Sequence, residues 1–319
     1  MRMRKAALLY NPASGGRGRR RQNELESALA FLRGAGVEAD LVPTESQDHA
    51  GDETRRAIDS GCDTIFACGG DGTIHNILQV LATTPVALAI MPMGTANALA
   101  HDIGLPQNLM DAAKAALRAV PRRIALGSVK YQDAEGHPAS KYFVVAAGVG
   151  VDAHLFYKLH SGTKQRMGMA AYYAKAWNLW FTYPMPRFAA EFVETGSEAT
   201  RRAEVTELLS VRIRNFGGIV QELAPGASLD RDDMRLILCR SASRLAYLAY
   251  VARCVLRRHW AIRGIDLAYG KKVSCEYLPS SATQAQPKIY VEADGELLGS
   301  LPIEITMVPD ALTLLAPPR

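Results

Sequence analysis

The first third of the chain alternates short apolar runs with stretches in which apolar residues recur every three or four positions. The short runs predict buried strands at residues 6–10, 37–42, 64–67 and 86–90. The longer period predicts helices at residues 25–32, 50–60, 74–81 and 109–120. Because strands alternate with helices, we expect a parallel sheet covered by helices on both faces.

After Pro121 the pattern changes to strand-like segments separated by turn signals, which predicts antiparallel sheets. These segments are residues 124–131, 142–147, 188–193, 205–214, 234–239, 262–268, 273–277, 289–292 and 303–307. Two helical segments interrupt them, at about residues 153–183 and 244–258. We therefore expect an α/β domain over residues 1–122 and a β-rich domain over residues 123–308. Residues 309–319 are expected to return to the first domain.

The composition is that of a folded globular protein, because 48% of the residues are hydrophobic and 22% are charged. Arginines gather at residues 17–21 and 253–258, either as solvated helix faces or as contacts for anionic partners. The five cysteines lack C-x-x-C or zinc spacing, which favours buried thiols in a reducing compartment. The first apolar run is too short for a signal peptide, and no stretch reaches the roughly 20 apolar residues that span a bilayer. We expect a soluble or peripheral cytoplasmic protein.

Glycines crowd the turn in FACGGDGTIHNIL, residues 66–78, between a predicted strand and a predicted helix. Gly69, Gly70 and Gly72 would let phosphate oxygens approach the backbone, although many such turns need glycine for geometry alone. Thr73 can cap the helix or donate to a phosphate. Further glycine turns follow the first strand, at residues 11–16, and the fourth, at residues 94–97. In an open α/β sheet such turns share one crevice, which indicates a nucleotide site, although the Rossmann and Walker patterns are both missing.

Asp71 places a carboxylate in the middle of the first of these turns. It would stabilise the helix N-terminus through the helix dipole, by about 0.3–1 kcal/mol. Facing a triphosphate, the same carboxylate would be repelled unless Mg²⁺ lay between them. We favour the metal interpretation, in which Asp71 binds the catalytic Mg²⁺ directly or through water.

An ordered set of motifs resembles the diacylglycerol kinase catalytic family, and more closely the bacterial lipid kinases related to diacylglycerol and sphingosine kinases. The motifs are GGDGT, the upstream NPASGG, the downstream PMGTANALAHDIGLP, AAGVGVDAHL (146–155), RNFGG (214–218), LAPGASLDRDDMRLIL (223–238) and VEADGE (291–296). GGDGT alone is shared with NAD kinases and phosphofructokinases, but the set covers nearly the whole chain. The resemblance implies a doubly wound α/β nucleotide domain, a C-terminal antiparallel β-sandwich with helical inserts, and an active site in the interdomain cleft.

The resemblance also implies an activity, which is transfer of the ATP γ-phosphoryl group, with Mg²⁺, to the hydroxyl of a lipid alcohol such as diacylglycerol or a sphingoid base. The residues that would surround ATP are Asn11, Thr44, Gly69, Gly70, Asp71, Gly72, Thr73, Gly94, Thr95 and Asn97. Thr44 is equally well explained as an ordinary cap for the helix predicted after it.

Two acidic residues near the C-terminus take a catalytic role only through the resemblance. On pattern alone, Asp294-Gly295-Glu296 is a hairpin turn. By resemblance, Glu296 accepts the hydroxyl proton and Asp294 assists, or the two roles are reversed.

A second metal site is implied by the structural Mg²⁺ loop of the family, which uses a carboxylate and backbone carbonyls. Its ligands here would be the side chain of Asp232 and the carbonyls of Leu229 and Met234. This chain has Asp233 where the family pattern L-x-x-D-G-x has glycine.

Aromatic and basic residues are interleaved in LFYKLHSGTKQRMGMAAYYAKAWNLWFTYPM, residues 155–185. The pattern fits a core helix with a basic outer face, or a lipid-entrance helix that meets anionic headgroups. A second lipid contact would comprise Arg253, Val255, Leu256, Arg257, Arg258, His259 and Trp260. We expect peripheral association with the inner face of the membrane, and a homodimer is compatible with the sequence.

Two other functions stay open on the sequence. An NAD kinase-like enzyme would use a soluble acceptor, but the chain has GTAN and the aromatic-basic segment and lacks the N-E dipeptide of NAD kinases. A non-catalytic nucleotide- or membrane-binding regulator would have no need of Asp71, Asp294 and Glu296. A nucleic-acid partner is not expected, because no recognition fold accompanies the arginines.

Overall fold

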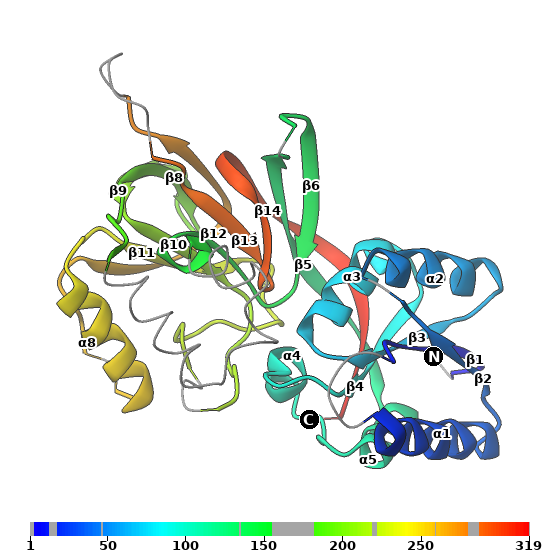
Figure 1. Cartoon of the computed structure of the whole chain (residues 1–319). Helices are drawn as coiled ribbons and strands as arrows, with labels where there is room; N and C mark the ends of the chain where they lie inside the picture. Colours follow the sequence, from blue (N-terminus) through cyan, green and yellow to red (C-terminus); the bar gives the residue numbers. More distant parts are fainter. Residues whose placement is uncertain are drawn as a thin grey trace. The chain divides into compact units, whose positions relative to one another are not determined.

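A computed structural model describes residues 3–12, 18–45, 47–133, 135–154, 182–218, 222–258, 260–279 and 287–318 (Figure 1). The chain divides into two compact units. The first unit is Met1–Leu126 with Asn215–Ile219 and Val308–Arg319, and the second is Gly127–Arg214 with Val220–Met307. The short segment Asn215–Ile219 therefore joins the first unit, although the sequence boundaries had placed it in the second.

The first unit contains a parallel sheet in the order β2 (Glu38–Pro43), β1 (Lys5–Tyr10), β3 (Thr64–Gly69) and β4 (Ala87–Pro92). The last part of β14 (Glu296–Ala316) adds a parallel strand beside β4, with Thr313 opposite Ala87. Strands β3 and β4 are buried along their whole length, which is why they read as continuous apolar runs.

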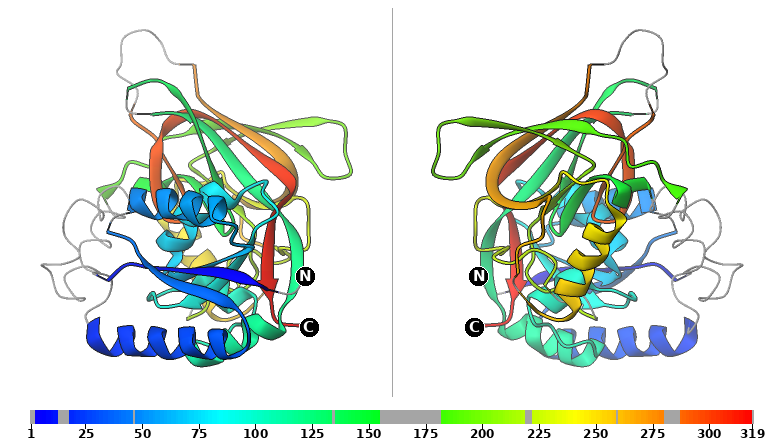
Figure 2. Two further views of the ribbon diagram at one scale, coloured as in Figure 1. Left: turned by 90° about the vertical axis from the view of Figure 1, so that its right-hand side faces the viewer. Right: turned by 90° about the vertical axis from the view of Figure 1, so that its left-hand side faces the viewer.

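Helices cover both faces of this sheet, as the alternating pattern predicted. The helices are α1 (Gly18–Gly34), α2 (Gln47–Asp59), α3 (Asp71–Leu81), α4 (Ala98–Asp102) and α5 (Leu109–Arg118). Helices α1 and α5 pack together on one face and α2 and α3 on the other (Figures 1 and 2). Side chains alternate along β1, so Ala6 and Leu8 share a core with Leu25 and Leu32 of α1. The five-residue helix α4 is not predicted by the sequence, because it is too short to show a helical period.

The second unit is antiparallel, and its strands run in the order β14, β13 (Tyr290–Ala293), β7 (Ala146–Gly150), β10 (Glu207–Val211), β11 (Met234–Cys239), β12 (Ile265–Tyr277), β8 (Phe188–Glu194) and β9 (Thr200–Val205). β12 also pairs with β14, with Val273 opposite Ile305, so the sheet closes on itself. β5 (Val120–Gln132) and β6 (Pro138–Phe143) form a further hairpin. The core inside contains Phe143, Phe188, Leu236 and Ile305. The α/β plus β-sandwich fold class is thereby confirmed.

Four predicted strand segments do not correspond one to one with observed strands. The segment 142–147 is two strands, because the amides of residues 144–146 turn toward a carboxylate instead of a neighbouring strand. The segment 205–214 is broken at Thr206, whose hydroxyl contacts the carbonyls of Cys239 and Ser241. The segments 262–268 and 273–277 are one strand, β12, with a register irregularity between Gly270 and Val273.

The two predicted helical segments have different outcomes. Helix α8 (Arg244–Val255) occupies the segment expected at 244–258. In the segment expected at 153–183, Ala153 and His154 are helical, and residues 155–181 lie outside the part of the chain that the structure describes.

Candidate functional site

Two glycine turns of the first unit touch back to back. A methyl group built on Gly94 would lie 2.5 Å from the Cα of Gly70, and one built on Gly70 would lie 3.1 Å from the Cα of Gly94. Only residues without a Cβ allow backbones to approach this closely. The turn after β3 and the turn after β4 therefore form one continuous surface of exposed backbone at the carboxyl ends of the strands.

Asn97 fixes the shape of the second turn. Its side-chain oxygen accepts from the N–H of Gly94 at 2.8 Å, and its amide donates to the Gly94 carbonyl at 3.1 Å and to Gln107 at 3.0 Å. The residue is buried and adopts the left-handed conformation, with φ of 49°, which asparagine tolerates better than most residues. Asn97 therefore organises the turn from within.

Asp71 joins the two turns through a hydrogen bond. It is the first residue of α3, and its Oδ1 accepts from the backbone N–H of Ala98, the first residue of α4, at 2.8 Å. The carboxylate is partly buried, and it lies where two helices begin. Both helix N-termini present positive partial charge here, which suits anionic groups.

The other residues expected at a nucleotide occupy varied positions around these turns. Thr44 is buried, and its N–H donates to the carbonyl of Tyr10, so it holds the end of β2 against β1. Thr73 lies in the first turn of α3, close to Gly69, and Thr95 is exposed. Asn11 follows directly on β1, and residues 13–17 of its turn lie outside the described residues.

A contact that sequence reasoning missed connects α4 with residues 214–218. Asp102 accepts from the backbone N–H of Asn215 at 2.9 Å. A methyl group on Gly217 would lie 2.5 Å from the ring of His101. The motifs GTANALAHD and RNFGG were both visible in the sequence, but nothing in their spacing showed that they meet.

In the second unit, Asp294 and Gly295 form the turn of a tight hairpin between Ala293 and Glu296. Both turn residues have positive φ, 50° and 85°, as a two-residue turn of this type requires. Oδ1 of Asp294 accepts from the N–H groups of Val145 and Ala146, at 2.8 and 3.1 Å, and Oδ2 accepts from Val144 at 3.0 Å. The carboxylate thus anchors the hairpin to the loop between β6 and β7.

Glu296 directly follows the turn of the same hairpin. It is the first residue of β14 and is partly exposed. The sequence suggests the two acids as a pair, and the structure shows three backbone N–H groups donating to Asp294.

Three carboxyl groups lie close together near this hairpin, those of buried Glu207 and Glu292 and of half-buried Asp152, and no local pattern in the sequence pointed to them as a group. Glu292 accepts from the N–H of Gly295 at 2.8 Å, and a methyl group on Gly148 would lie about equally close to Glu292 and Asp152, at 2.8 and 3.0 Å. Burial raises the pKa of Asp152 to about 6. Burial and the charge of Asp152 raise the pKa of Glu207 and Glu292 well above the ordinary range for glutamate.

Arginine side chains lie against the loop that was expected to hold a structural Mg²⁺. Arg212 is fully buried and donates to the carbonyls of Arg231 and Asp233 at 2.7 and 2.5 Å. Arg231 binds Asp233 through two hydrogen bonds of 2.6 and 2.7 Å. Burial by itself would raise the pKa of Asp233, but these bonds outweigh it and the pKa is lowered.

These contacts bear on whether the loop fits a metal ion. Asp232, the expected carboxylate ligand, is exposed, and neither Asp232 nor Asp233 has the positive φ that would favour glycine. A buried guanidinium already supplies positive charge to the carbonyls on either side of Asp232, and a second cation beside it would be repelled. We infer from this positive charge that the loop does not bind a structural Mg²⁺.

Comparison with known protein families covers both units. Residues 5–129 match the model of the diacylglycerol kinase catalytic domain, and residues 144–316 match that of the YegS C-terminal NAD kinase beta sandwich-like domain. The chain belongs to the diacylglycerol kinase family. A diacylglycerol kinase of Staphylococcus saprophyticus is 28% identical over 302 residues, covering 94% of this chain and 91% of that protein. One of Bacillus subtilis is 27% identical over 308 residues, covering 95% and 93%.

Solved structures of low identity share the fold of this family member. A crystal structure of a diacylglycerol kinase from Bacillus anthracis superposes with a TM-score of 0.69 at 18% identity, covering 100% of this chain and 98% of that one. Yeast NADH kinase in complex with NADH gives a TM-score of 0.53 at 9% identity, covering 99% and 84%. None of the helices in the described residues has the length and hydrophobicity needed to cross a bilayer.

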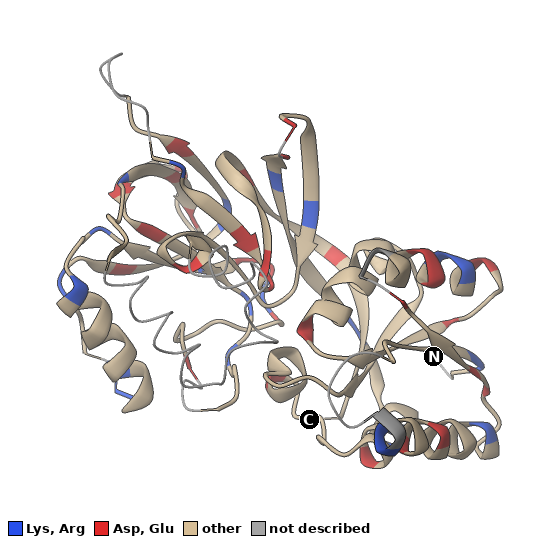
Figure 3. Cartoon of the chain, in the orientation of Figure 1, with Lys and Arg blue, Asp and Glu red and all other residues tan. Residues whose placement is uncertain are grey.

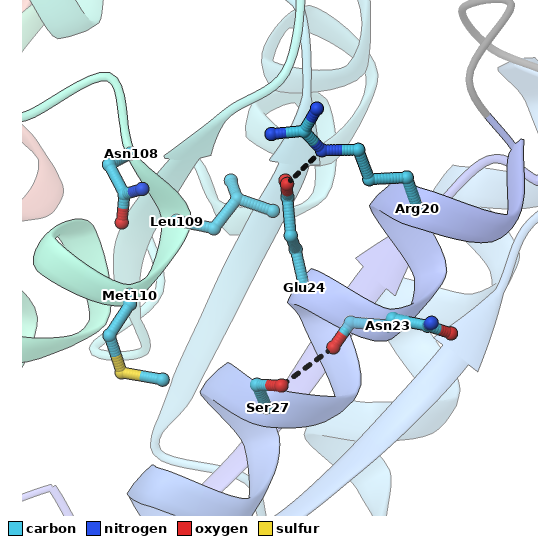
Figure 4. Close-up of a pocket in the computed structure, with 7 residues that line it drawn as sticks. All are labelled: Arg20, Asn23, Glu24, Ser27, Asn108, Leu109 and Met110. Carbon is cyan, nitrogen blue, oxygen red and sulfur yellow. Dashed lines mark hydrogen bonds and ion pairs between the residues drawn. The ribbon is translucent and has the colours of Figure 1, made fainter.

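A surface pocket of the first unit lies apart from the glycine turns. It is formed where α1 meets the start of α5, with Arg20 and Glu24 on one side and Asn108 and Met110 on the other (Figure 4). Arg20 and Glu24 bind each other across one turn of α1, at 3.0 Å. None of the expected nucleotide residues contributes to the pocket, so we assign it no role in the reaction.

Proposed function

We propose that this member of the diacylglycerol kinase family is an ATP- and Mg²⁺-dependent lipid kinase acting on diacylglycerol, a sphingoid base or a related lipid alcohol. The observation that carries the proposal is the close contact of the two glycine turns, with Asp71 bonded across them. This surface offers backbone donors and two helix N-termini to phosphates. The proposed enzyme acts in the cytoplasm, peripherally at the inner face of the membrane.

On the nucleotide side, the glycine turns would bind the phosphates through main-chain N–H groups, with Asn11, Thr44, Thr73 and Thr95 around them. Asp71 fits a Mg²⁺ site, because Mg²⁺ is commonly held by one or two carboxylates together with substrate phosphates. When bound, the ion would neutralise charge that develops on the transferred phosphoryl group. Asn97 would act by keeping the second turn in shape.

On the acceptor side, we assign Glu296 as the proton acceptor and Asp294 as the residue that holds the hairpin. In the proposed reaction the lipid oxygen bonds to the γ-phosphorus as the bond from that phosphorus to the β-phosphate oxygen breaks. The hydroxyl proton passes to Glu296, and ADP leaves. This assignment requires the second unit to present Glu296 to the nucleotide bound by the first.

The test is a phosphoryl-transfer assay with labelled ATP, Mg²⁺ and a panel of lipid alcohols, together with NAD, in mixed micelles. We expect labelled lipid and no labelled NAD. Label on NAD alone would instead identify a soluble acceptor. NAD is a necessary control because the chain shares its fold with yeast NADH kinase. Tight ATP binding without transfer to any acceptor would favour a regulator.

Asp71→Asn tests the nucleotide side within the same assay. Asparagine keeps an oxygen for the N–H of Ala98, so the fold should persist. Removing the charge should lower turnover on the order of 100-fold or more. Asp111→Asn is the matched control, because Asp111 also lies in the first turn of a helix but pairs only with exposed Lys114. Near-normal turnover of Asp71→Asn would contradict the assigned role.

A further inference from the structure

The exposed large hydrophobic side chains of the second unit gather on α8 and the residues after it. They are Leu245 (77% exposed), Val251 (49%), Val255 (41%), Leu256 (61%) and Trp260 (43%). Outside this group, the described residues have only Val120, Val193 and Leu297 in the same class, each on a different strand. We call the group of five the α8 patch. An apolar group of this kind on a protein surface marks a site of interaction.

The patch lies on the outer side of a helix that is already anchored by its inner side. Tyr247, Tyr250 and Cys254 face inward, where the Tyr247 hydroxyl is 2.8 Å from that of Thr206 and the Tyr250 hydroxyl donates to the Leu223 carbonyl at 2.7 Å. The helix is therefore apolar on both sides, a pattern that is typical of a helix buried all round. Within the part of the chain that the structure describes, burial on one side alone leaves the apolar residues of the α8 patch exposed.

The charges around the patch are of one sign. From residue 240 to residue 265 the sequence contains six arginines and no aspartate or glutamate. Figure 3 shows basic but no acidic positions along α8. Asp266, the next acid, pairs with Arg240 at 3.0 Å. Arg257, Arg258 and Arg263 are exposed.

Not every charge of this region belongs to the outer surface. Arg253 is buried and lies over the ring of Tyr250, at 4.2 Å, on the inner side of the helix. Glu222 lies near Cys254, also on the inner side, where its charge acts on that thiol. The outer surface therefore combines leucine, valine and tryptophan side chains with several arginines and one acid, Asp266, which is paired with Arg240.

We infer that the α8 patch docks the protein onto an anionic membrane surface, with its apolar side chains in the headgroup region and its arginines against lipid phosphates. Such a surface matches both properties of the patch, because apolar burial and attraction to anionic lipid act together. A second copy of the same patch would bring arginines against arginines. A nucleic acid would satisfy the arginines but leave Leu245 and Leu256 in water. The inference adds a docking surface to the proposed lipid kinase without depending on catalysis.

The test is flotation of the full chain, without nucleotide, on vesicles of phosphatidylcholine alone and on vesicles that also contain phosphatidylglycerol. We expect binding to the anionic vesicles only, and weakening of that binding with added salt. Arg257→Ala with Arg258→Ala should weaken binding about 30-fold, at roughly 1 kcal/mol for each arginine near the surface. Leu245→Ser with Leu256→Ser should abolish it.

Val193→Ser with Arg202→Ala is the matched control, because it removes an exposed apolar residue and an exposed arginine from β8 and β9. This variant should float like the unchanged protein. Equal flotation of the α8 variants, or no flotation of the unchanged protein on anionic vesicles, would overturn the inference. A shift of the α8 variants from dimer to monomer in sedimentation would also overturn it, in favour of self-association.

Kinase activity separates this inference from the proposed function. On a short-chain diacylglycerol dissolved as monomers, the α8 variants should keep the turnover of the unchanged protein, while on vesicles they should lose it. Loss of flotation with turnover retained on the dissolved lipid supports the docking surface. Flotation retained by a protein that phosphorylates no lipid would refute the kinase proposal and leave the docking surface standing.

Discussion

Asp294 and Glu296 lie two residues apart, yet their surroundings suit them to different tasks. The three N–H groups that donate to Asp294 occupy its lone pairs and fix its position. Glu296 is the first residue of β14 and is partly exposed. A group that accepts a proton from substrate must be reachable, whereas a group that holds a turn must be engaged. Substitution of Asp294 should therefore lower stability, and substitution of Glu296 should lower turnover.

Asp294→Asn should destabilise the protein by about 2 kcal/mol, because two backbone donors keep only a neutral acceptor and the third loses its partner. Glu296→Gln should leave stability unchanged and lower kcat on the order of 100-fold, with little effect on KM. Urea denaturation and steady-state kinetics on each variant measure the two effects. An Asp294→Asn protein as stable as the parent would refute the structural role, and full turnover in Glu296→Gln would refute the proton acceptor.

The sequence predicts the hairpin but not the hydrogen bonds that hold it in place. Asp-Gly between two apolar runs predicts a tight turn, because both residues tolerate positive φ. The donors at residues 144–146 lie about 150 residues away along the chain. A local sequence pattern contains no information about a contact across that separation. The sequence therefore predicts one strand at 142–147, where the structure has a break at the residues that Asp294 binds.

Arginine side chains hold the loop before β11 in place. Arg212 and the Arg231–Asp233 pair satisfy the carbonyls and the carboxylate of the loop. Arg231 and Arg235 also lie over the ring of Tyr269, at 4.0 and 4.1 Å, which holds both cations in place. The glycine that the family pattern has at position 233 is replaced here by one member of this ion pair.

The melting temperature of the nucleotide-free protein should therefore be the same in EDTA and in Mg²⁺. Differential scanning fluorimetry across a Mg²⁺ titration measures this directly. Arg231→Ala should lower stability by about 1–3 kcal/mol, because buried Asp233 loses its partner. Arg202→Ala, which removes an exposed arginine paired with exposed Glu191, is the control and should cost at most about 1 kcal/mol. A saturable rise of several degrees with Mg²⁺ would show that the loop binds metal after all.

The raised pKa values of the three carboxyl groups near the hairpin predict how stability depends on pH. In the folded protein Asp152, Glu207 and Glu292 keep protons that the unfolded chain releases near pH 4, because their pKa values are raised. The folded state therefore binds more protons than the unfolded state above that pH. Its free energy of unfolding should fall as the pH rises from about 4 through 6 and beyond.

Urea midpoints measured from pH 5 to pH 8 test this dependence. Glu207→Gln keeps an acceptor for the Tyr247 hydroxyl but removes one titrating group, so it should flatten the fall and raise stability at the alkaline end. Glu204→Gln, at an exposed position, should leave the curve unchanged. A stability curve that rises with pH over this range would contradict the raised pKa values.

The two units are not two halves of the chain. The first unit takes its sheet from residues before Leu126 and completes it with the end of β14. Sequence pattern identified both fold classes because helix and strand periods differ within a few residues. It did not show β14 as one strand of 21 residues, because a strand that passes from one core to another has no single apolar face.

The first unit should therefore fail to fold without the C-terminus of the chain. Leu312 and Leu314 are fully buried, and each should contribute roughly 1.5–3 kcal/mol that a shortened chain loses, while β4 is left with an unpaired edge. A fragment of residues 1–126 should be aggregated or unfolded by circular dichroism and hydrogen exchange. The same fragment joined through a flexible linker to residues 308–318 should give protected amides in β3 and β4. Cooperative unfolding of the 1–126 fragment by itself would show that β14 is dispensable to this core.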